Sequence, residues 1–116
     1  MVYYIRAKSY YRYALDLFKD LPKIKKNPSE LQKKAQEIFN LGLKAIWALS
    51  YVLPPEKPPE FKELWGKTVE SLDSDDVAKL EKIRNTIFSE KPEEEKIIEN
   101  IREFLEIIKK VLKPLL

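Results

Sequence analysis

Apolar and aromatic residues recur at helical spacing along most of this chain. From about Val2 to Asp20 they follow steps of three and four residues, which predicts an amphipathic helix. A second helix has a clear predicted start, because Asn27 is a good N-cap, Pro28 suits the first helical position and Glu30 completes the capping pattern. We expect this helix to run to about Val52. Its second half is apolar on nearly all sides, which predicts a central position.

Three further patterns follow a proline-rich connector, LPPEKPPE at 53–60, which cannot continue the second helix. They predict helices from about Glu60 to Leu72, from about Ser74 to Ser89, and from Pro92 onward. The positions expected to face inward are Phe61, Leu64, Trp65, Val69 and Leu72, then Val77, Leu80, Ile83, Ile87 and Phe88, then Ile97, Ile101, Phe104, Ile108 and Val111. The sequence shows no strand pattern and no internal repeat. We predict one all-α domain over residues 1–116, an antiparallel bundle of four long helices plus one short helix.

Composition excludes several kinds of chemistry. The chain has no cysteine and no histidine, so disulfides, thiolate nucleophiles and the usual general base are excluded, and we expect no metal or other cofactor. Lysine and glutamate are abundant, a balance seen in thermophile proteins. Residues 1–57 carry 11 Lys/Arg against 5 Asp/Glu, whereas residues 58–116 carry 11 against 14. The basic half either attracts phosphates or pairs with the acidic half inside the bundle.

The chain shows no signature of a targeting or membrane segment. Arg6, Lys8 and Arg12 interrupt the N-terminal segment before any long apolar run, unlike a signal peptide. The most apolar stretch, LGLKAIWALSYVL, has 13 residues and contains a lysine, so it is too short to span a bilayer. We therefore expect a cytoplasmic protein without a membrane partner.

Arg84 stands where the fourth predicted helix is expected to carry a hydrophobic residue, between Leu80 and Phe88. Burying an unpaired guanidinium is costly, so Arg84 must pair with a carboxylate, extend its stem toward solvent, or face a cleft. Asn85 lies at the edge of the same arc and Ser89 lies farther round. Two interpretations stay open: a structural ion pair, or a dimer cleft in which the arginines of two copies hold a phosphate.

The segments RAKSYYRYALDLF and KKAQEIFNLGLKAIWAL, with an arginine–polar pair on a later helix, resemble the HEPN superfamily of small helical bundles. Ala35, Glu37 and the run 43–46 carry the strongest part of the resemblance. Catalytically active members have an arginine, an adjacent polar residue and a histidine four to six residues after the arginine, and cleave RNA without a metal. Arg84 and Asn85 match the first two positions. The resemblance therefore implies the fold and a ligand cleft.

The histidine of the family motif is missing from this chain, and Ser89 stands at the usual position for it. A serine hydroxyl cannot replace an imidazole as a base or acid at neutral pH. The departure argues against nuclease activity. Family members often pair with a small nucleotidyltransferase, which is the partner that the resemblance implies.

Two other groups are candidates for ligand contacts. Lys44 lies inside the most apolar helix, where it either extends its ammonium to solvent or contacts a ligand. The N-terminal helix interleaves aromatic and basic residues, which can stack bases and neutralise phosphates, although tyrosines at helical spacing are more often core residues. The candidate surface patch consists of Tyr4, Arg6, Lys8, Tyr11 and Arg12.

Together these features predict a non-catalytic, homodimeric binding module that holds a nucleotide or RNA phosphate at a cleft containing Arg84 and Asn85. Ser89 and Lys44 are the further predicted ligand-binding residues. The alternative is a structural or regulatory protein-interaction domain in which Arg84 forms an internal ion pair. A third hypothesis, a carboxylate-dependent ribonuclease, would have to use a residue such as Glu90 as its base.

Overall fold

The computed structural model describes the backbone of residues 2–50 and 57–115 and the side chains of residues 5–50 and 57–115. The elements are α1 (Val2–Asp20), the 3-10 turn η1 (Leu21–Ile24), α2 (Pro28–Ala48), α3 (Phe61–Glu70), α4 (Ser74–Ile87), α5 (Glu94–Leu112) and the 3-10 turn η2 (Lys113–Leu115). Over these ranges the regular structure is helical throughout and no strand occurs. The predicted all-α bundle is confirmed.

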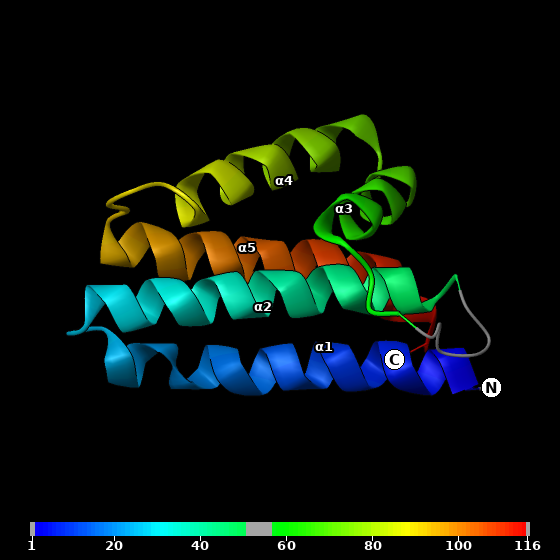
Figure 1. Ribbon diagram of the computed structural model, residues 1–116, viewed down its shortest axis with the longest axis horizontal. Coiled ribbons are helices and arrows are strands. Elements are labelled where there is room, and N and C mark those ends of the chain that lie inside the picture. The colour runs from blue at the N-terminus through cyan, green and yellow to red at the C-terminus, as the bar shows by residue number, and fades with distance from the viewer. Residues whose placement is uncertain (1, 51–56, 116) are drawn as a thin grey trace.

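The helix α2 is the centre of the bundle. It packs against each of the other four helices, most extensively against α1 and then α5. In Figure 1, α1, α2 and α5 run along the long axis of the molecule, α4 lies beyond α5, and the short α3 crosses them at an angle. The predicted central position of the apolar helix is therefore confirmed, and its residues are buried because neighbours cover it on several sides.

The helix boundaries follow local capping chemistry. At the start of α2 the side chain of Asn27 accepts a hydrogen bond of 3.2 Å from the backbone N–H of Glu30, as its sequence predicts. At its end the N–H of Leu49 reaches the carbonyl of Ile46 (3.1 Å), so the helix tightens into a turn and stops at Ala48. The predicted end at Val52 lies outside the described residues.

The next two helices are shorter than predicted. The third runs Phe61–Glu70 and the fourth ends at Ile87 rather than Ser89. The start of α4 is as expected, because the carboxylate of Asp73 accepts a 2.8 Å hydrogen bond from the N–H of Asp76. The aspartates at 73–76 therefore act as an N-terminal cap.

The ring of Phe39, on α2, joins the core to three other helices. Its centroid lies 4.7 Å from the ring of Phe104 on α5, 5.8 Å from that of Phe88 at the end of α4, and 6.4 Å from that of Trp65 on α3. Phe39 itself is fully buried. Aromatic pairs at these separations add to the stabilisation from buried area.

The structure differs from the predicted set of inward positions at two residues, Phe88 and Thr68. Phe88 is 46% exposed, because α4 has already ended and only the edge of the ring reaches Phe39. On α3 the pattern missed Thr68, which is fully buried and donates its hydroxyl to the carbonyl of Leu64 at 2.8 Å. A buried hydroxyl satisfied within its own helix carries no hydrophobic signal in the sequence.

The two glycines of the chain give a matched test of this packing. A Cβ at Gly42 would overlap the edge of the Phe104 ring and approach Ile108, whereas a Cβ at Gly66 would meet nothing within 4 Å. We expect Gly42→Ala to destabilise the fold by about 1–3 kcal/mol through overpacking. Gly66→Ala should stabilise it by about 0.5–1 kcal/mol, because alanine loses less entropy in a helix. Urea unfolding measures both, and equal effects would contradict the close α2–α5 approach.

Candidate functional site

Arg84 lies against two aromatic rings of α3. The central carbon of its guanidinium is 4.6 Å from the centroid of Phe61 and 4.7 Å from that of Trp65, and these two rings are stacked 6.1 Å apart. Arg84 is half-buried. Within the described part of the chain, no carboxylate forms an ion pair with it. The guanidinium is therefore accommodated by cation–π contacts, which hold α4 to α3.

Asn85 and Ser89 lie at a different place from Arg84. Together with Thr86 they line a hollow of about 370 Å³ at the turn from α4 into α5, and Arg84 is not among its lining residues. Successive helical residues point about 100° apart, so neighbours in sequence diverge. Two lysines and one glutamate complete the polar rim of the hollow: Lys91, Lys96 and Glu93. The structure of one chain thus does not bring Arg84 and Asn85 into one cleft.

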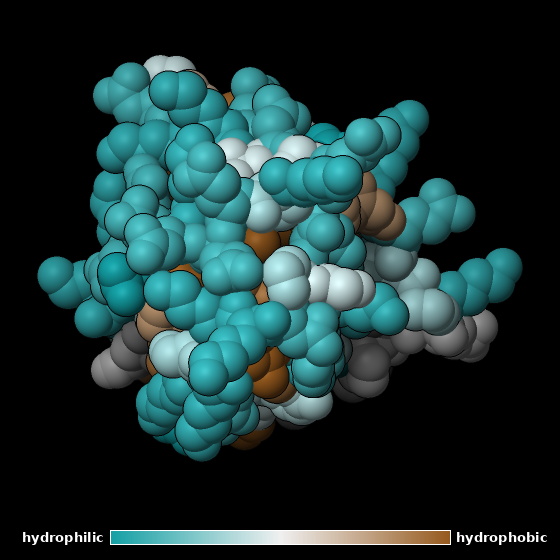
Figure 2. All heavy atoms as spheres, turned by 90° about the vertical axis from the view of Figure 1, so that its left-hand side faces the viewer, coloured by the Kyte–Doolittle hydropathy of each residue, from teal (hydrophilic) through white to brown (hydrophobic). Residues whose placement is uncertain are grey.

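Two glutamines of α2 fix the turn that carries Ser89. The side-chain amide of Gln32 donates to the carbonyls of Ile87 (3.0 Å) and Ser89 (2.7 Å), and that of Gln36 also reaches Ile87 (3.3 Å). These bonds satisfy carbonyls left unpaired at the end of α4. Figure 2 looks onto this end of the bundle, where most of the visible side chains are hydrophilic and apolar atoms show between them. Sequence spacing does not predict the glutamine contacts, because their partners are more than 50 residues away.

The predicted surface patch on α1 is not one continuous surface. Tyr11 is 5% exposed, which corrects its assignment to the patch: it lies one turn after the buried Ala7, on the side of α1 that packs into the bundle. Arg12 is exposed and Lys8 half-buried. The side chain of Tyr4 lies outside the described residues. Arg6, the remaining member, belongs to another feature.

Arg6 and Lys44 line one hollow between α1 and α2, although the sequence placed them in separate groups. The hollow has a volume of about 170 Å³, and Lys57 joins it from the segment that leads into α3. In Figure 1 this segment crosses over α2 near the C-terminal end of that helix. The lining residues are Arg6, Tyr10, Lys44, Trp47, Lys57, Pro58 and Pro59. Three cationic side chains and two aromatic ones thus meet at one place, and none of the described lining residues is a carboxylate.

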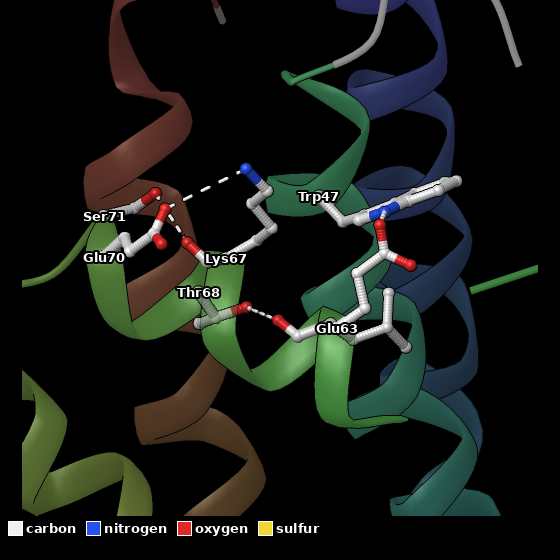
Figure 3. A network of polar contacts seen from close by, with 7 residues as sticks. Trp47, Glu63, Lys67, Thr68, Glu70 and Ser71 are labelled. Carbon is white, nitrogen blue, oxygen red and sulfur yellow. Dashed lines mark hydrogen bonds and ion pairs between the residues drawn. The ribbon is translucent and has the colours of Figure 1, made fainter. Parts of the chain in front are cut away.

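A hydrogen bond from α3 helps to orient the aromatic wall of this hollow. The indole N–H of Trp47 donates to the carboxylate of Glu63 at 3.3 Å, and Figure 3 shows that carboxylate directed at the indole from α3. Trp47 is itself buried, at 5% exposure. The ring is therefore a fixed wall, while Arg6 and Lys44 are half-buried and Lys57 is exposed. Fixed aromatic rings beside longer cationic side chains suit a planar, negatively charged ligand.

The sequence held part of the signal for this site. Residues 1–57 carry an excess of basic residues, and Arg6, Lys44 and Lys57 all belong to this half of the chain. Spacing did not show that Lys57 lines the same hollow as Arg6, because these residues belong to separate segments that lie far apart in the sequence. The acidic residues offer no comparable centre: in the described ranges, no three or more His, Cys, Asp or Glu side chains converge as a metal site would require. Glu90 is exposed and lines a separate hollow.

Comparison with family models, with curated proteins and with solved structures finds no significant match to this chain. Among the described residues, no helix is both long enough and apolar enough to cross a membrane.

We expect Arg84→Met to cost about 0.5–2 kcal/mol of stability, because methionine keeps an apolar stem but loses the cation over the two rings. Urea unfolding gives the change, and a double-mutant cycle with Trp65→Leu isolates the coupling. Lys82→Met, at an exposed position of the same helix, should stay within about 0.5 kcal/mol of the wild type. An unchanged stability together with lost ligand binding would make Arg84 a ligand contact instead of a structural one.

Two groups predict how stability changes at alkaline pH. Burial raises the pKa of Tyr11, and the charge of Glu106 raises it further. The hydrogen bond to Asp76, 3.1 Å long, raises the pKa of Lys110. Both groups hold their protons more tightly in the folded state, so the stability they contribute is complete below the unfolded pKa values and falls as pH rises above about 10.

Unfolding in urea between pH 8 and pH 11 measures this decline. Tyr11→Phe should make it shallower, because the phenylalanine ring has no proton to lose. Tyr13→Phe is the matched control, since it removes a hydroxyl from a side chain that is 54% exposed, and it should follow the wild-type curve. Identical slopes for the wild type and Tyr11→Phe would contradict the assignment.

Proposed function

We propose that this chain is a HEPN-like, non-catalytic binding module that holds the phosphate of a nucleotide or RNA in the hollow between α1, α2 and the segment before α3. The observation that supports the proposal is the meeting of Arg6, Lys44 and Lys57 at one hollow, to which no described residue contributes a lining carboxylate. Cationic side chains that converge from separate segments create a local positive potential that attracts phosphate groups.

The shape of the hollow suits part of a nucleotide. Its volume of about 170 Å³ is below the range of about 300–1,000 Å³ that is usual for a site enclosing a whole drug-sized ligand. A phosphate and the edge of one base fit this description better than a complete nucleotide. Lys44 and Lys57 act as point charges beside phosphate oxygens, and the guanidinium of Arg6 adds to the positive charge at the hollow. Tyr10 and Trp47 supply aromatic surface for a base.

Binding without turnover is consistent with the side chains present. The chain has no histidine and no cysteine, and the described residues that line the hollow are cationic, aromatic or proline. Such a set offers no group poised to accept a proton near neutral pH. We therefore propose that bound RNA is held intact.

This proposal places the main ligand contact at Lys44 and not at Arg84. The second hollow, with Asn85, Ser89 and two lysines, stays a predicted phosphate contact that a second copy of the chain would have to complete. The homodimer and the nucleotidyltransferase partner likewise rest on the resemblance alone. The mass of the protein in solution tests the dimer.

The alternative is a structural or regulatory interaction domain that takes no nucleic acid. It is favoured by the cation–π contacts of Arg84, which give this residue a role in stability without any ligand. In that case the protein should bind neither nucleotides nor RNA at moderate salt. This alternative expects an ion pair of Arg84, but among the described residues Arg84 contacts the rings of Phe61 and Trp65 and no carboxylate pairs with it.

Replacing Lys44 by glutamine tests the proposed site. For a fluorescein-labelled RNA octamer we expect Lys44→Gln to weaken binding about tenfold, as for the loss of one charge-assisted contact. The slope of log affinity against log salt should fall in magnitude by about one unit. Fluorescence anisotropy over a salt series gives both quantities.

The matched control for this experiment is Lys79→Gln, which makes the same charge change at an exposed position on α4. It should leave the affinity within twofold of the wild type. Equal losses for Lys44→Gln and Lys79→Gln would mean that only net charge matters, and the site would be wrong. Cleavage of the octamer during the titration would overturn the non-catalytic assignment.

A further inference from the structure

We propose that the groove between α1 and α2 continues from this hollow to a second subsite and binds an extended single strand of nucleic acid. The inference rests on the proposed function, since the first hollow supplies one end of the groove. The second subsite is a hollow of about 350 Å³ at the other end of the helix pair. Its lining residues are Leu17, Asp20, Lys23, Ile24 and Lys34.

The residues of α1 in both hollows share one face of that helix. They follow steps of four, three and four residues, the spacing of a single helical stripe. The stripe consists of Arg6, Tyr10, Tyr13 and Leu17. Tyr13 stands between the two hollows and is 54% exposed, a high value for a large aromatic side chain in the middle of a helix. Its ring is therefore available for a base to stack on.

This stripe is separate from the face of α1 that packs on α5. The ring centroid of Phe18 lies 5.8 Å from the guanidinium carbon of Arg102 on α5. The charge of Glu106, also on α5, raises the pKa of Tyr11. Tyr10 and Leu17, each one residue earlier, point about 100° away from those positions. The groove thus lies on the side of the α1–α2 pair that α5 does not cover.

The helix α2 provides a facing stripe on the other side of the groove. Its members are Lys34, Glu37, Leu41 and Lys44, at steps of three, four and three residues. Because α1 and α2 are antiparallel neighbours, Lys44 faces the Arg6 end and Lys34 faces the Leu17 end. Leu41 lies between them, half-buried against the core. The groove therefore has cations at both ends, and Leu41, Tyr13 and the carboxylate of Glu37 lie between them.

The second hollow combines an apolar floor with exchangeable charges. Leu17 and Ile24 offer surface to a base. Lys23 is paired with Asp20 at 3.3 Å, and Lys34 is paired with Glu37 at 3.5 Å. All four of these side chains are more than 40% exposed, so the pairs are weak and a phosphate can replace the carboxylates as partner of the lysines.

The length of the groove fixes the kind of ligand. Arg6 and Leu17 are eleven residues apart on α1, which is about 16 Å at 1.5 Å per residue. A stacked strand advances about 3.4 Å per nucleotide, so the groove spans about five nucleotides. A mononucleotide reaches one hollow only, whereas a single strand reaches both. Bases paired in a duplex are not free to stack on Tyr13.

A length series tests this inference. We expect the affinity for oligouridylates of two, four, six, eight and ten nucleotides to rise by more than tenfold up to about six and then to level off. Fluorescence anisotropy at fixed salt measures the series. The same decamer annealed to its complement should bind at least tenfold more weakly. An oligothymidylate decamer distinguishes RNA from DNA as the source of the strand, since tighter RNA binding requires contacts to the 2′-hydroxyl.

Variants at the far end of the groove separate this inference from the proposed function. Tyr13→Ala and the double variant Lys23→Gln/Lys34→Gln should each weaken decamer binding at least fivefold and leave dinucleotide binding unchanged. Lys79→Gln/Lys82→Gln, at exposed positions on α4, is the matched charge control and should change neither. Lys44→Gln should weaken both ligands.

The possible failures are distinct. Dinucleotide binding that depends on Lys44 but does not improve with length would overturn the groove and keep the proposed site. Equal competition by polyglutamate of matched charge would show attraction by charge alone and would also overturn the groove. Absence of any binding, at low salt and with a folded protein by circular dichroism, would overturn both proposals.

Discussion

The bundle depends on the ring of Phe39, which meets an aromatic ring from each of α3, α4 and α5. A fully buried ring at such a junction makes three helices share one packing arrangement, so none can move without disturbing the others. One turn along α2, the missing side chain of Gly42 lets Phe104 reach this position. Large and small residues on α2 thus complement each other: the ring fills the centre and the glycine makes room for its closest partner.

The fourth helix buries Leu80, Ile83 and Ile87 in this core, and polar and aromatic contacts add to its attachment. Gln32 and Gln36 satisfy the carbonyls at its C-terminal end, and Lys110 pairs with Asp76 near its N-terminus. Arg84 lies between them on the two rings of α3. A charged residue on the inward side of a helix therefore needs neither a carboxylate nor a ligand, because an aromatic surface can stabilise a cation that keeps part of its hydration. The contacts with Phe61 and Trp65 therefore give Arg84 a stabilising role that needs no ligand.

The α1–α2 pair carries the more promising surface because α5 covers only one side of it. On the open side, Arg6 and Lys44 meet Lys57 at one hollow, and Tyr13 leads toward a second hollow that Lys34 lines. Among the described residues that line the two hollows, the carboxylate is Asp20 at the second hollow, where Asp20 pairs with Lys23 and Glu37 pairs with Lys34. A strongly basic end followed by aromatic and apolar surface is the combination that single-stranded nucleic acids require, since phosphates and bases need different partners.

The sequence by itself determined the helical class, the boundaries of α1 and the start of α2, because periodicity and capping by Asn27 are local effects. It also excluded histidine- and cysteine-based chemistry and located the basic half of the chain. Only the tertiary structure decided which partner each polar residue has. Arg84 lies on rings that precede it by about twenty residues, Tyr11 is buried although its neighbour Arg12 is exposed, and Lys57 lines the same hollow as Arg6. Such contacts depend on how helices are placed around one another, and spacing along a single helix contains no information about that placement.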